Sequence, residues 1–143
     1  MALDYETVMS KVQTDLPFSY DDRDTILYAL SIGMGRDPLD DHELPFVFEQ
    51  GEPLRTVPTL ATVLVPEMFP VGLGWDYSQI LHGEQRLKLY RPLPPSGDLL
   101  INKRVVDVFD RGEKLGALFL LEAEGRLASD DTALFTMGCT IVA

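Results

Sequence analysis

The feature that most constrains the fold is a series of four strand-like segments in the C-terminal part of the chain. Polar and apolar residues alternate over 86–91, and three longer segments with apolar faces follow at 99–110, 116–128 and 133–142. Short turns rich in glycine, proline, arginine or aspartate separate these segments. Consecutive strands joined by short turns are typical of an antiparallel meander. We therefore expect a sheet built mainly from this part of the chain.

The N-terminal part is expected to supply a helix. Residues 1–19 are typical of an extended arm with one short strand or turn. Asp21 is a good N-cap residue, and Asp24 takes the place of the glutamate in a capping box. Glycines follow residue 32, so we expect the helix to span 22–33. Its apolar stripe at helical spacing consists of Ile26, Leu27, Leu30 and Met34.

The middle of the chain is expected to be irregular. A short apolar strand is predicted over 45–49, after a polar loop. Prolines and glycines between 58 and 74 forbid a long uninterrupted helix there. One helical turn is expected over 76–81. Together with the strands, these elements predict an α+β fold in a single domain over 1–143.

Composition excludes several classes of partner. The formal net charge of −11 argues against nucleic acid and anionic membrane surfaces, since both require a basic footprint. No apolar stretch reaches transmembrane length, and the N-terminus has no apolar core typical of a signal peptide. The single cysteine, Cys139, is expected to be a buried, inert thiol in a reducing compartment. His42 lies among consecutive acidic residues that lack the spacing of metal ligands, so no metal site is expected.

Six segments resemble, in the same order, the N-terminal half of the hydratase 2 (MaoC-like) enzymes. The most specific is 81–85, which reads L-H-G-E-Q, and it is followed at 91–97 by a turn similar to the family's P-L-P-x-S-G. The other segments lie at 20–30, 46–49, 57–59 and 106–112. The resemblance implies a hot-dog-like fold, in which an antiparallel sheet packs on an early helix and the central helix is shortened or broken.

The resemblance also implies an activity. That family hydrates a trans-2-enoyl-CoA thioester to a (3R)-3-hydroxyacyl-CoA, without a metal or redox cofactor. Two hot-dog halves form one unit, and the catalytic Asp and His lie in the C-terminal half, in a G-D-x-N-P-x-H motif. Here the nearest string is 76–82, in which Asp76 and His82 are one residue further apart and the Asn-Pro is missing. We therefore expect no catalytic residue in this chain, with Asp76 and His82 as the nearest candidates.

A binding role remains for a half of this kind. By resemblance, His82 and Gly83 contact the CoA thioester, and Arg111 takes the place of a family lysine that meets the CoA. An arginine suits that role because its guanidinium holds phosphate oxygens in a fork. The broken segment 58–74 would leave an apolar channel for an acyl tail. The structural alternatives are that His82 is a hydrogen-bonded histidine at a strand start and that Arg111 is a solvated residue in a turn. For Glu84, the alternative to an acid–base role is a structural carboxylate.

Three functions stay open. The first is the N-terminal, substrate-binding half of a (3R)-hydroxyacyl-CoA dehydratase, which holds an acyl-CoA beside a second hot-dog half. That half would belong to the same or a different chain, in a homodimer or heterodimer. The second is a non-catalytic acyl-thioester-binding module. The third, a hot-dog thioesterase, ranks last because such enzymes usually place an acidic residue on the central helix. An intracellular location is expected, cytoplasmic in a bacterium or peroxisomal in a eukaryote.

Overall fold

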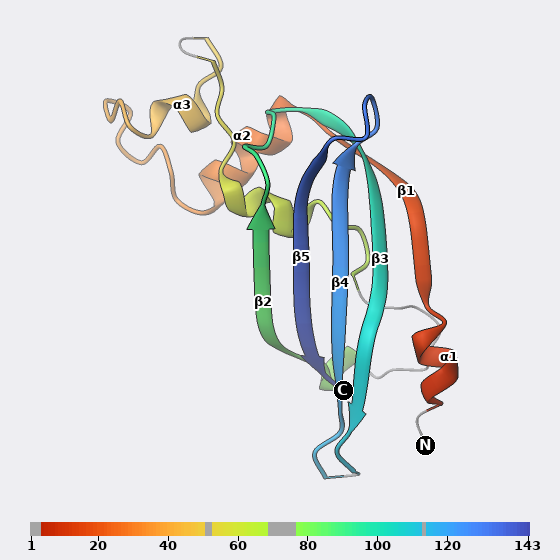
Figure 1. Ribbon diagram of the computed structural model, residues 1–143. Helices are drawn as coiled ribbons and strands as arrows, with labels where there is room; N and C mark the ends of the chain where they lie inside the picture. The colour runs from red at the N-terminus through yellow and green to blue at the C-terminus, as the bar shows by residue number, and fades with distance from the viewer. Residues whose placement is uncertain (1–3, 51–52, 69–76, 113) are drawn as a thin grey trace.

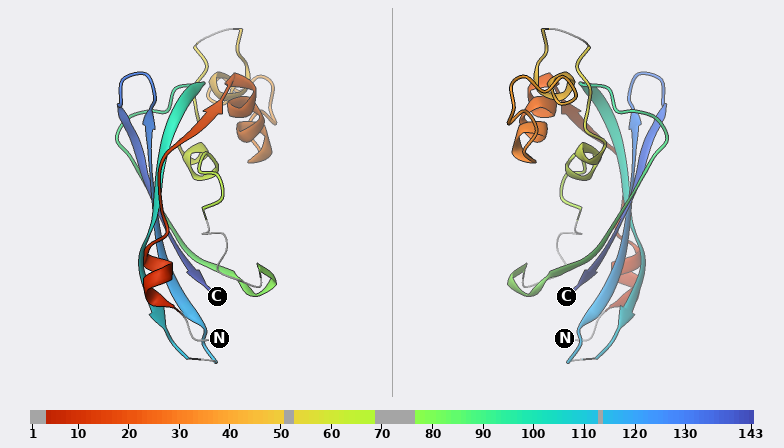
Figure 2. Two further views of the ribbon diagram at one scale, coloured as in Figure 1. Left: turned by 90° about the vertical axis from the view of Figure 1, so that its right-hand side faces the viewer. Right: turned by 90° about the vertical axis from the view of Figure 1, so that its left-hand side faces the viewer.

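The computed structural model describes residues 4–50, 53–68, 77–112 and 114–143. It contains a five-stranded antiparallel sheet in the order β1-β3-β4-β5-β2 (Figure 1). The strands are β1 (Val12–Tyr20), β2 (Leu81–Leu89), β3 (Gly97–Asp110), β4 (Ala117–Leu127) and β5 (Ala133–Val142). The sheet is curved, and the helical segments that follow β1 lie on its concave side (Figure 2). We call this concave side the inner face.

The predicted meander is confirmed for β3, β4 and β5 but is wrong for β2. β2 pairs with β5 rather than with β3, the next strand in the sequence. The proline-rich connection between β2 and β3 is fixed across the end of the sheet instead of folding into a hairpin. The hydroxyl of Tyr20 donates to the Pro94 carbonyl (2.6 Å), and that of Thr25 donates to the Pro95 carbonyl (2.8 Å). β1 then fills the place beside β3.

The first helices agree only partly with the sequence pattern. The five-residue helix α1 (Tyr5–Met9) is present where an extended arm was expected. Helix α2 (Asp22–Ser31) has the predicted capping box: Asp24 N–H donates to Asp21, and Asp21 N–H donates to Asp24. These reciprocal bonds satisfy two N–H groups that the first turn would leave unpaired.

The predicted apolar stripe of α2 is wrong. Thr25 and Ala29 are the buried residues of this helix, whereas Leu27 is 66% exposed and Leu30 is 49% exposed. Ile26 and Met34 are half-buried. Small side chains face inward because the helix lies close to the β2–β3 connection, to whose carbonyl Thr25 donates.

The middle segment contains short helices. α3 (Leu44–Val47) replaces the strand predicted over 45–49. Its proline stands in the first turn, where a missing N–H costs nothing and the fixed φ favours a helix. The segment after residue 57 forms only a 3₁₀ helix, η1 (Pro58–Val63), which confirms the broken central helix as far as residue 68. The expected turn near 76–81 is η2 (Tyr77–Gln79).

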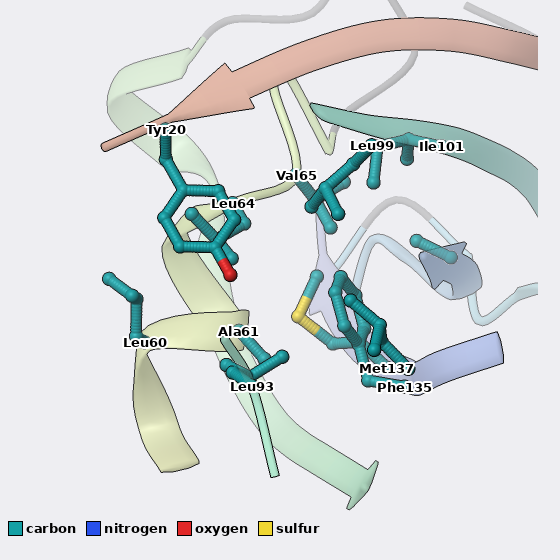
Figure 3. Close-up of a cluster of buried hydrophobic side chains, with 12 residues drawn as sticks. Tyr20, Leu60, Ala61, Leu64, Val65, Leu93, Leu99, Ile101, Phe135 and Met137 are labelled. Carbon is teal, nitrogen blue, oxygen red and sulfur yellow. The ribbon is translucent and has the colours of Figure 1, made fainter. Parts of the chain in front are cut away.

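The hydrophobic core lies between the inner face and these segments. Leu60, Ala61, Leu64 and Val65 pack against inner-face residues of β3 and β5 (Figure 3). A second cluster, towards α1, contains Val8, Val105, Val108, Ala117, Phe119, Leu121, Cys139 and Ile141. In the described part of the chain, no helix is both long and apolar enough to cross a membrane.

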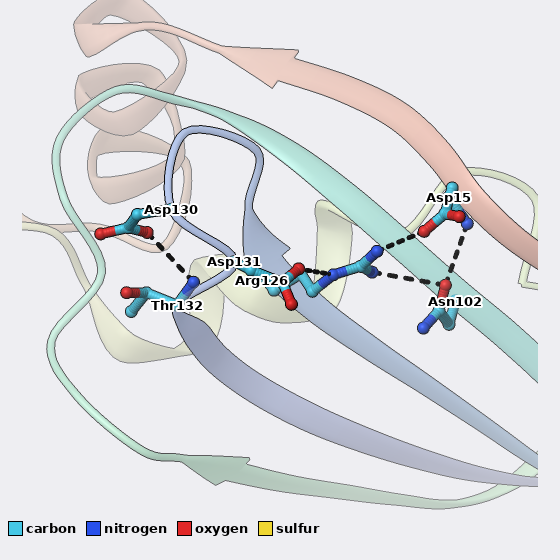
Figure 4. A network of polar contacts seen from close by, with 6 residues as sticks. All are labelled: Asp15, Asn102, Arg126, Asp130, Asp131 and Thr132. Carbon is cyan, nitrogen blue, oxygen red and sulfur yellow. Dashed lines mark hydrogen bonds and ion pairs between the residues drawn. The ribbon is translucent and has the colours of Figure 1, made fainter.

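A polar network on β1 makes this edge of the sheet irregular. The β1–β3 register shifts between Gln13 and Leu16, and Asp15 in between has a φ of 55°. Arg126 of β4 pairs with the carboxylates of Asp15 and Asp131 (Figure 4). Asn102 accepts a hydrogen bond from Asp15 N–H at 2.9 Å and one from Arg126 at 3.4 Å. The network therefore fixes a bulge in the edge strand.

Gly125 of β4 is required by close packing. A Cβ at this position would lie 2.3 Å from Cζ of the buried Phe135 ring on β5. We expect Gly125→Ala to lower the free energy of unfolding by about 1–3 kcal/mol, because the ring has to move within a packed core. Urea denaturation measures this change. The control is Gly97→Ala, whose Cβ would meet its nearest atom at an ordinary 3.5 Å. An equal loss in both variants would contradict the packing argument.

Candidate acyl-thioester site

His82 stands at the start of β2, on the inner face of an edge strand. It lies opposite the buried Ile141 of β5, and residues directly opposite each other share one face of a sheet. The register then shifts, so that Gly83 has no partner in β5. A bulge of this kind leaves the extra residue outside the hydrogen-bond ladder and redirects the neighbouring side chain. His82 is exposed although it faces inward.

The bulge fixes the hydrogen bonding of the His82 ring. Its Nε2 atom lies 3.0 Å from the Glu84 carbonyl oxygen and 3.2 Å from Cys139 Sγ. A carbonyl oxygen only accepts, so Nε2 must carry the proton in this arrangement. In the neutral ring Nδ1 is then the unprotonated nitrogen, and its lone pair can accept a hydrogen bond from a ligand or a water.

Cys139 is buried beneath this histidine, as the sequence predicted. Burial raises the pKa of the Cys139 thiol above its ordinary value, and the Arg86 guanidinium partly opposes the rise. The protonated Nε2 cannot take the thiol proton, so His82 does not act as a base for Cys139 in this geometry. The thiol packs against the ring and limits its orientation.

Glu84 makes the contacts expected of a structural carboxylate. On the outer face of β2, its Oε2 accepts from Thr140 Oγ1 at 3.2 Å and from Arg86 Nη1 at 3.3 Å. The side chains of this ion pair are 51% and 57% exposed, so the pair contributes little to stability. Glu84 therefore orients the neighbouring strand residues and does not face the inner site.

Arg111 lies in the turn between β3 and β4. Its backbone N–H donates to the Gly116 carbonyl at 2.9 Å, and its side chain is exposed. This turn is at the same end of the sheet as His82, because the start of β2 pairs with the end of β5, and that end pairs with the start of β4. Three strand spacings separate β2 from β3, about 14 Å. Asp76, the other catalytic candidate, lies outside the described residues.

No group of three or more His, Cys, Asp or Glu side chains that could hold a metal ion is found among the described residues. His42 is exposed in a loop, and its backbone N–H donates to the side chain of Asp40.

Lys103 is the inner-face residue that the sequence analysis missed. It occupies the inward position between Ile101 and Val105 on β3 and is only 9% exposed. Its ammonium donates to the carbonyls of Pro66 (2.8 Å) and Glu67 (2.5 Å), at the end of the segment that contains η1. Burial lowers the pKa of Lys103 below its ordinary value, and the Glu67 carboxylate partly opposes this. The alternation of inward residues along β3 would have placed Lys103 on the inner face.

These features define the class of the protein. A curved antiparallel sheet around a short, broken central helix is the hot-dog architecture of MaoC-like proteins, which confirms the expected fold. The crystal structure of a MaoC-like dehydratase from Phytophthora capsici superposes with a TM-score of 0.75 at 22% identity. The match covers 96% of this chain and 48% of that one.

The sequence places the chain within one family. Residues 18–143 match the model of the MFE-2 hydratase 2 N-terminal domain, and the chain belongs to this family. It is similar to the peroxisomal enoyl-CoA hydratase 2 of Arabidopsis thaliana, with 32% identity over 76% of this chain. It is also 32% identical, over 87% of its length, to 3-hydroxyacyl-thioester dehydratase Y of Mycobacterium tuberculosis. These matches cover 37% and 42% of the two relatives, so the chain spans well under half of their length.

The environment of Cys139 leads to a test of the ring geometry. With a raised pKa and an imidazole that cannot accept its proton, the thiol should react with a disulfide reagent at least about 10-fold more slowly in the folded protein than in urea. Because the chain has a single cysteine, the released chromophore reports on this residue alone. His82→Ala should not slow the reaction of the folded protein. Rapid labelling that is lost in His82→Ala would mean that His82 activates the thiol.

Proposed function

We propose that this chain is the substrate-binding half of a (3R)-hydroxyacyl-CoA dehydratase, or trans-2-enoyl-CoA hydratase 2. A second hot-dog half would supply the catalytic Asp and His. The proposal rests on the match of this chain to the model of an N-terminal domain. The chain covers 37% of a relative named as an enoyl-CoA hydratase and 42% of one named as a hydroxyacyl-thioester dehydratase. Membership of the hydratase 2 family supports an acyl-CoA thioester as the ligand.

The arrangement at the start of β2 supports a contact with the thioester. In the neutral ring, the hydrogen bond to Glu84 leaves Nδ1 of His82 as an acceptor at an exposed inner-face position, and Gly83 stands in the bulge. A backbone N–H outside the β2–β5 ladder can polarise a thioester carbonyl as negative charge develops on its oxygen. Arg111, exposed at the same end of the sheet, would pair with a phosphate of the CoA. Addition of water to the enoyl thioester is general acid–base chemistry, so the reaction needs no metal or redox cofactor.

The two edges of the sheet differ in a way that favours a partner along β2. β1 carries Pro17, a bulge and the left-handed Asp15, which are devices that block the addition of another strand. β2 also has a bulge, at Gly83, but it has neither a proline nor a left-handed residue, and its residues from 81 to 86 are exposed. The exposed Leu27 and Leu30 on α2 add apolar surface that a partner would cover. We infer that the second half, from the same or another chain, pairs along β2 in a homodimer or heterodimer.

The proposal includes a location. One of the relatives is named as peroxisomal. A peroxisomal site in a eukaryote, or the cytoplasm in a bacterium, would place this chain where acyl-CoA thioesters are metabolised.

The test measures hydration and binding separately. The chain alone should bind decenoyl-CoA saturably but leave its enoyl absorbance unchanged. Mixed with the separate C-terminal half of a hydratase 2, it should restore turnover. Arg111→Ala should raise KM about 10-fold with little change in kcat, because a phosphate contact is equal in the ground and transition states. His82→Ala should lower kcat/KM, since the thioester contact strengthens as charge develops.

Matched controls distinguish the alternatives. Arg104→Ala serves as the control for Arg111→Ala, because the Arg104 guanidinium pairs with Glu122 on the outer face. Turnover by the chain alone that disappears in His82→Ala would assign catalysis to Asp76 and His82 and overturn the division of labour. Binding without activation of any catalytic half would favour a non-catalytic acyl-thioester module. Release of free CoA would favour a thioesterase.

A further inference from the structure

The bulge at Gly83 changes which residues of β2 face inward. In a regular strand side chains alternate between the two faces, so Glu84 and Arg86 would follow His82 on the inner face. The register instead shifts between His82 and Glu84. A shift of one residue moves every later side chain of the strand to the other face. Glu84 therefore lies on the outer face, and Gln85 takes the inward position that follows His82.

Gln85 lies beside His82 on the inner face. It pairs with Cys139 of β5, whereas His82 pairs with Ile141. Cys139 and Ile141 are two residues apart in one strand, so the backbones of Gln85 and His82 are about 7 Å apart. The thiol of Cys139, opposite Gln85, also lies 3.2 Å from Nε2 of His82. Both Gln85 and His82 are exposed. An amide and an imidazole are thus accessible next to each other.

The bulge places an amide, rather than a carboxylate, next to the histidine. An inward Glu84 would present oxygens that only accept hydrogen bonds, and these would repel the carbonyl oxygen of a thioester. The neutral ring of His82 offers an acceptor at Nδ1, which cannot bind that oxygen either. The Gln85 amide carries two N–H donors. Because this amide is neutral, removing water from it costs less than desolvating a charged donor.

We propose that Gln85 is a substrate-binding residue, whose amide N–H donates to the carbonyl oxygen of the acyl thioester. The inference rests on the proposed function and adds a residue to the same site. A carbonyl oxygen has two lone pairs, so it can accept from Gln85 and from a backbone N–H of the bulge at once. Both hydrogen bonds strengthen as negative charge develops on this oxygen during the reaction. The bulge therefore serves to turn the donor, and not the acid beside it in the sequence, towards the ligand.

The experiment compares two ligands on the full chain by calorimetry: decanoyl-CoA and S-decyl-CoA, a thioether with the same tail that lacks the carbonyl oxygen. The thioester should bind more tightly than the thioether. Gln85→Met keeps the length of the side chain and removes both donors. It should weaken thioester binding about 5-fold, the value of one neutral hydrogen bond, and leave thioether binding nearly unchanged. Gln85→Glu should weaken binding of the thioester further relative to the thioether, because a carboxylate repels the carbonyl oxygen.

Glu84→Met is the matched control, because it introduces the same side chain at the adjacent residue on the opposite face. It should leave both affinities unchanged. Loss of the thioester preference in Glu84→Met rather than in Gln85→Met would overturn the inference.

The remaining outcomes also decide. Equal affinities of the wild-type protein for the two ligands, or equal weakening of both in Gln85→Met, would overturn a contact between Gln85 and the carbonyl. If Gln85→Met does not fold, Gln85→Glu and the wild-type comparison decide in its place. Failure of both ligands to bind would overturn the proposed function itself, whereas equal binding of both overturns only the role of Gln85.

Discussion

The structure depends on what lies against the inner face of the sheet. Pro66 prevents a long helix there, and η1 with the residue after it covers one part of the face through Leu60, Ala61 and Leu64. Burial of such side chains stabilises the fold by about 1.5–3 kcal/mol for each leucine. Pro66 and Glu67 follow η1 in a turn, and their carbonyls point towards the inner face. The Lys103 ammonium donates to both carbonyls and so holds this turn against β3.

Local patterns predicted those parts of the fold that local interactions decide. The capping box of α2 involves residues three apart, and β3, β4 and β5 follow from alternation and short turns. The pairing of β2 with β5 was missed because it depends on distant contacts, in which Tyr20 and Thr25 hold the β2–β3 connection across the sheet. The buried face of α2 was predicted wrongly from its hydrophobic stripe, because this helix packs against backbone carbonyls of the β2–β3 connection rather than against an apolar surface. At residues 45–49, a proline in the first turn outweighed the strand propensity of the aromatic and β-branched residues.

Those residues of the candidate site that belong to a specific sequence motif could be predicted, and the others could not. The L-H-G-E-Q run indicated His82 and Gly83, but alternation alone would have placed every residue of β2 in a regular ladder. The bulge that separates them from β5 is not visible in the sequence. Lys103 was visible as a charged residue among inward apolar positions, yet no local pattern shows which atoms it meets. Its partners are 36 and 37 residues away along the chain.

A polar residue on an inner face conflicts with the pattern of a hydrophobic core, and such conflicts are concentrated at functional sites. His82 and Lys103 are two such residues, at opposite sides of one face. His82 is exposed on the edge at which we propose that a second half brings a catalytic group to the thioester. Lys103 is buried beside β1, whose Pro17 and left-handed Asp15 keep another strand away. The two edges therefore differ: β2 is the edge at which we propose assembly, whereas β1 opposes the addition of another strand.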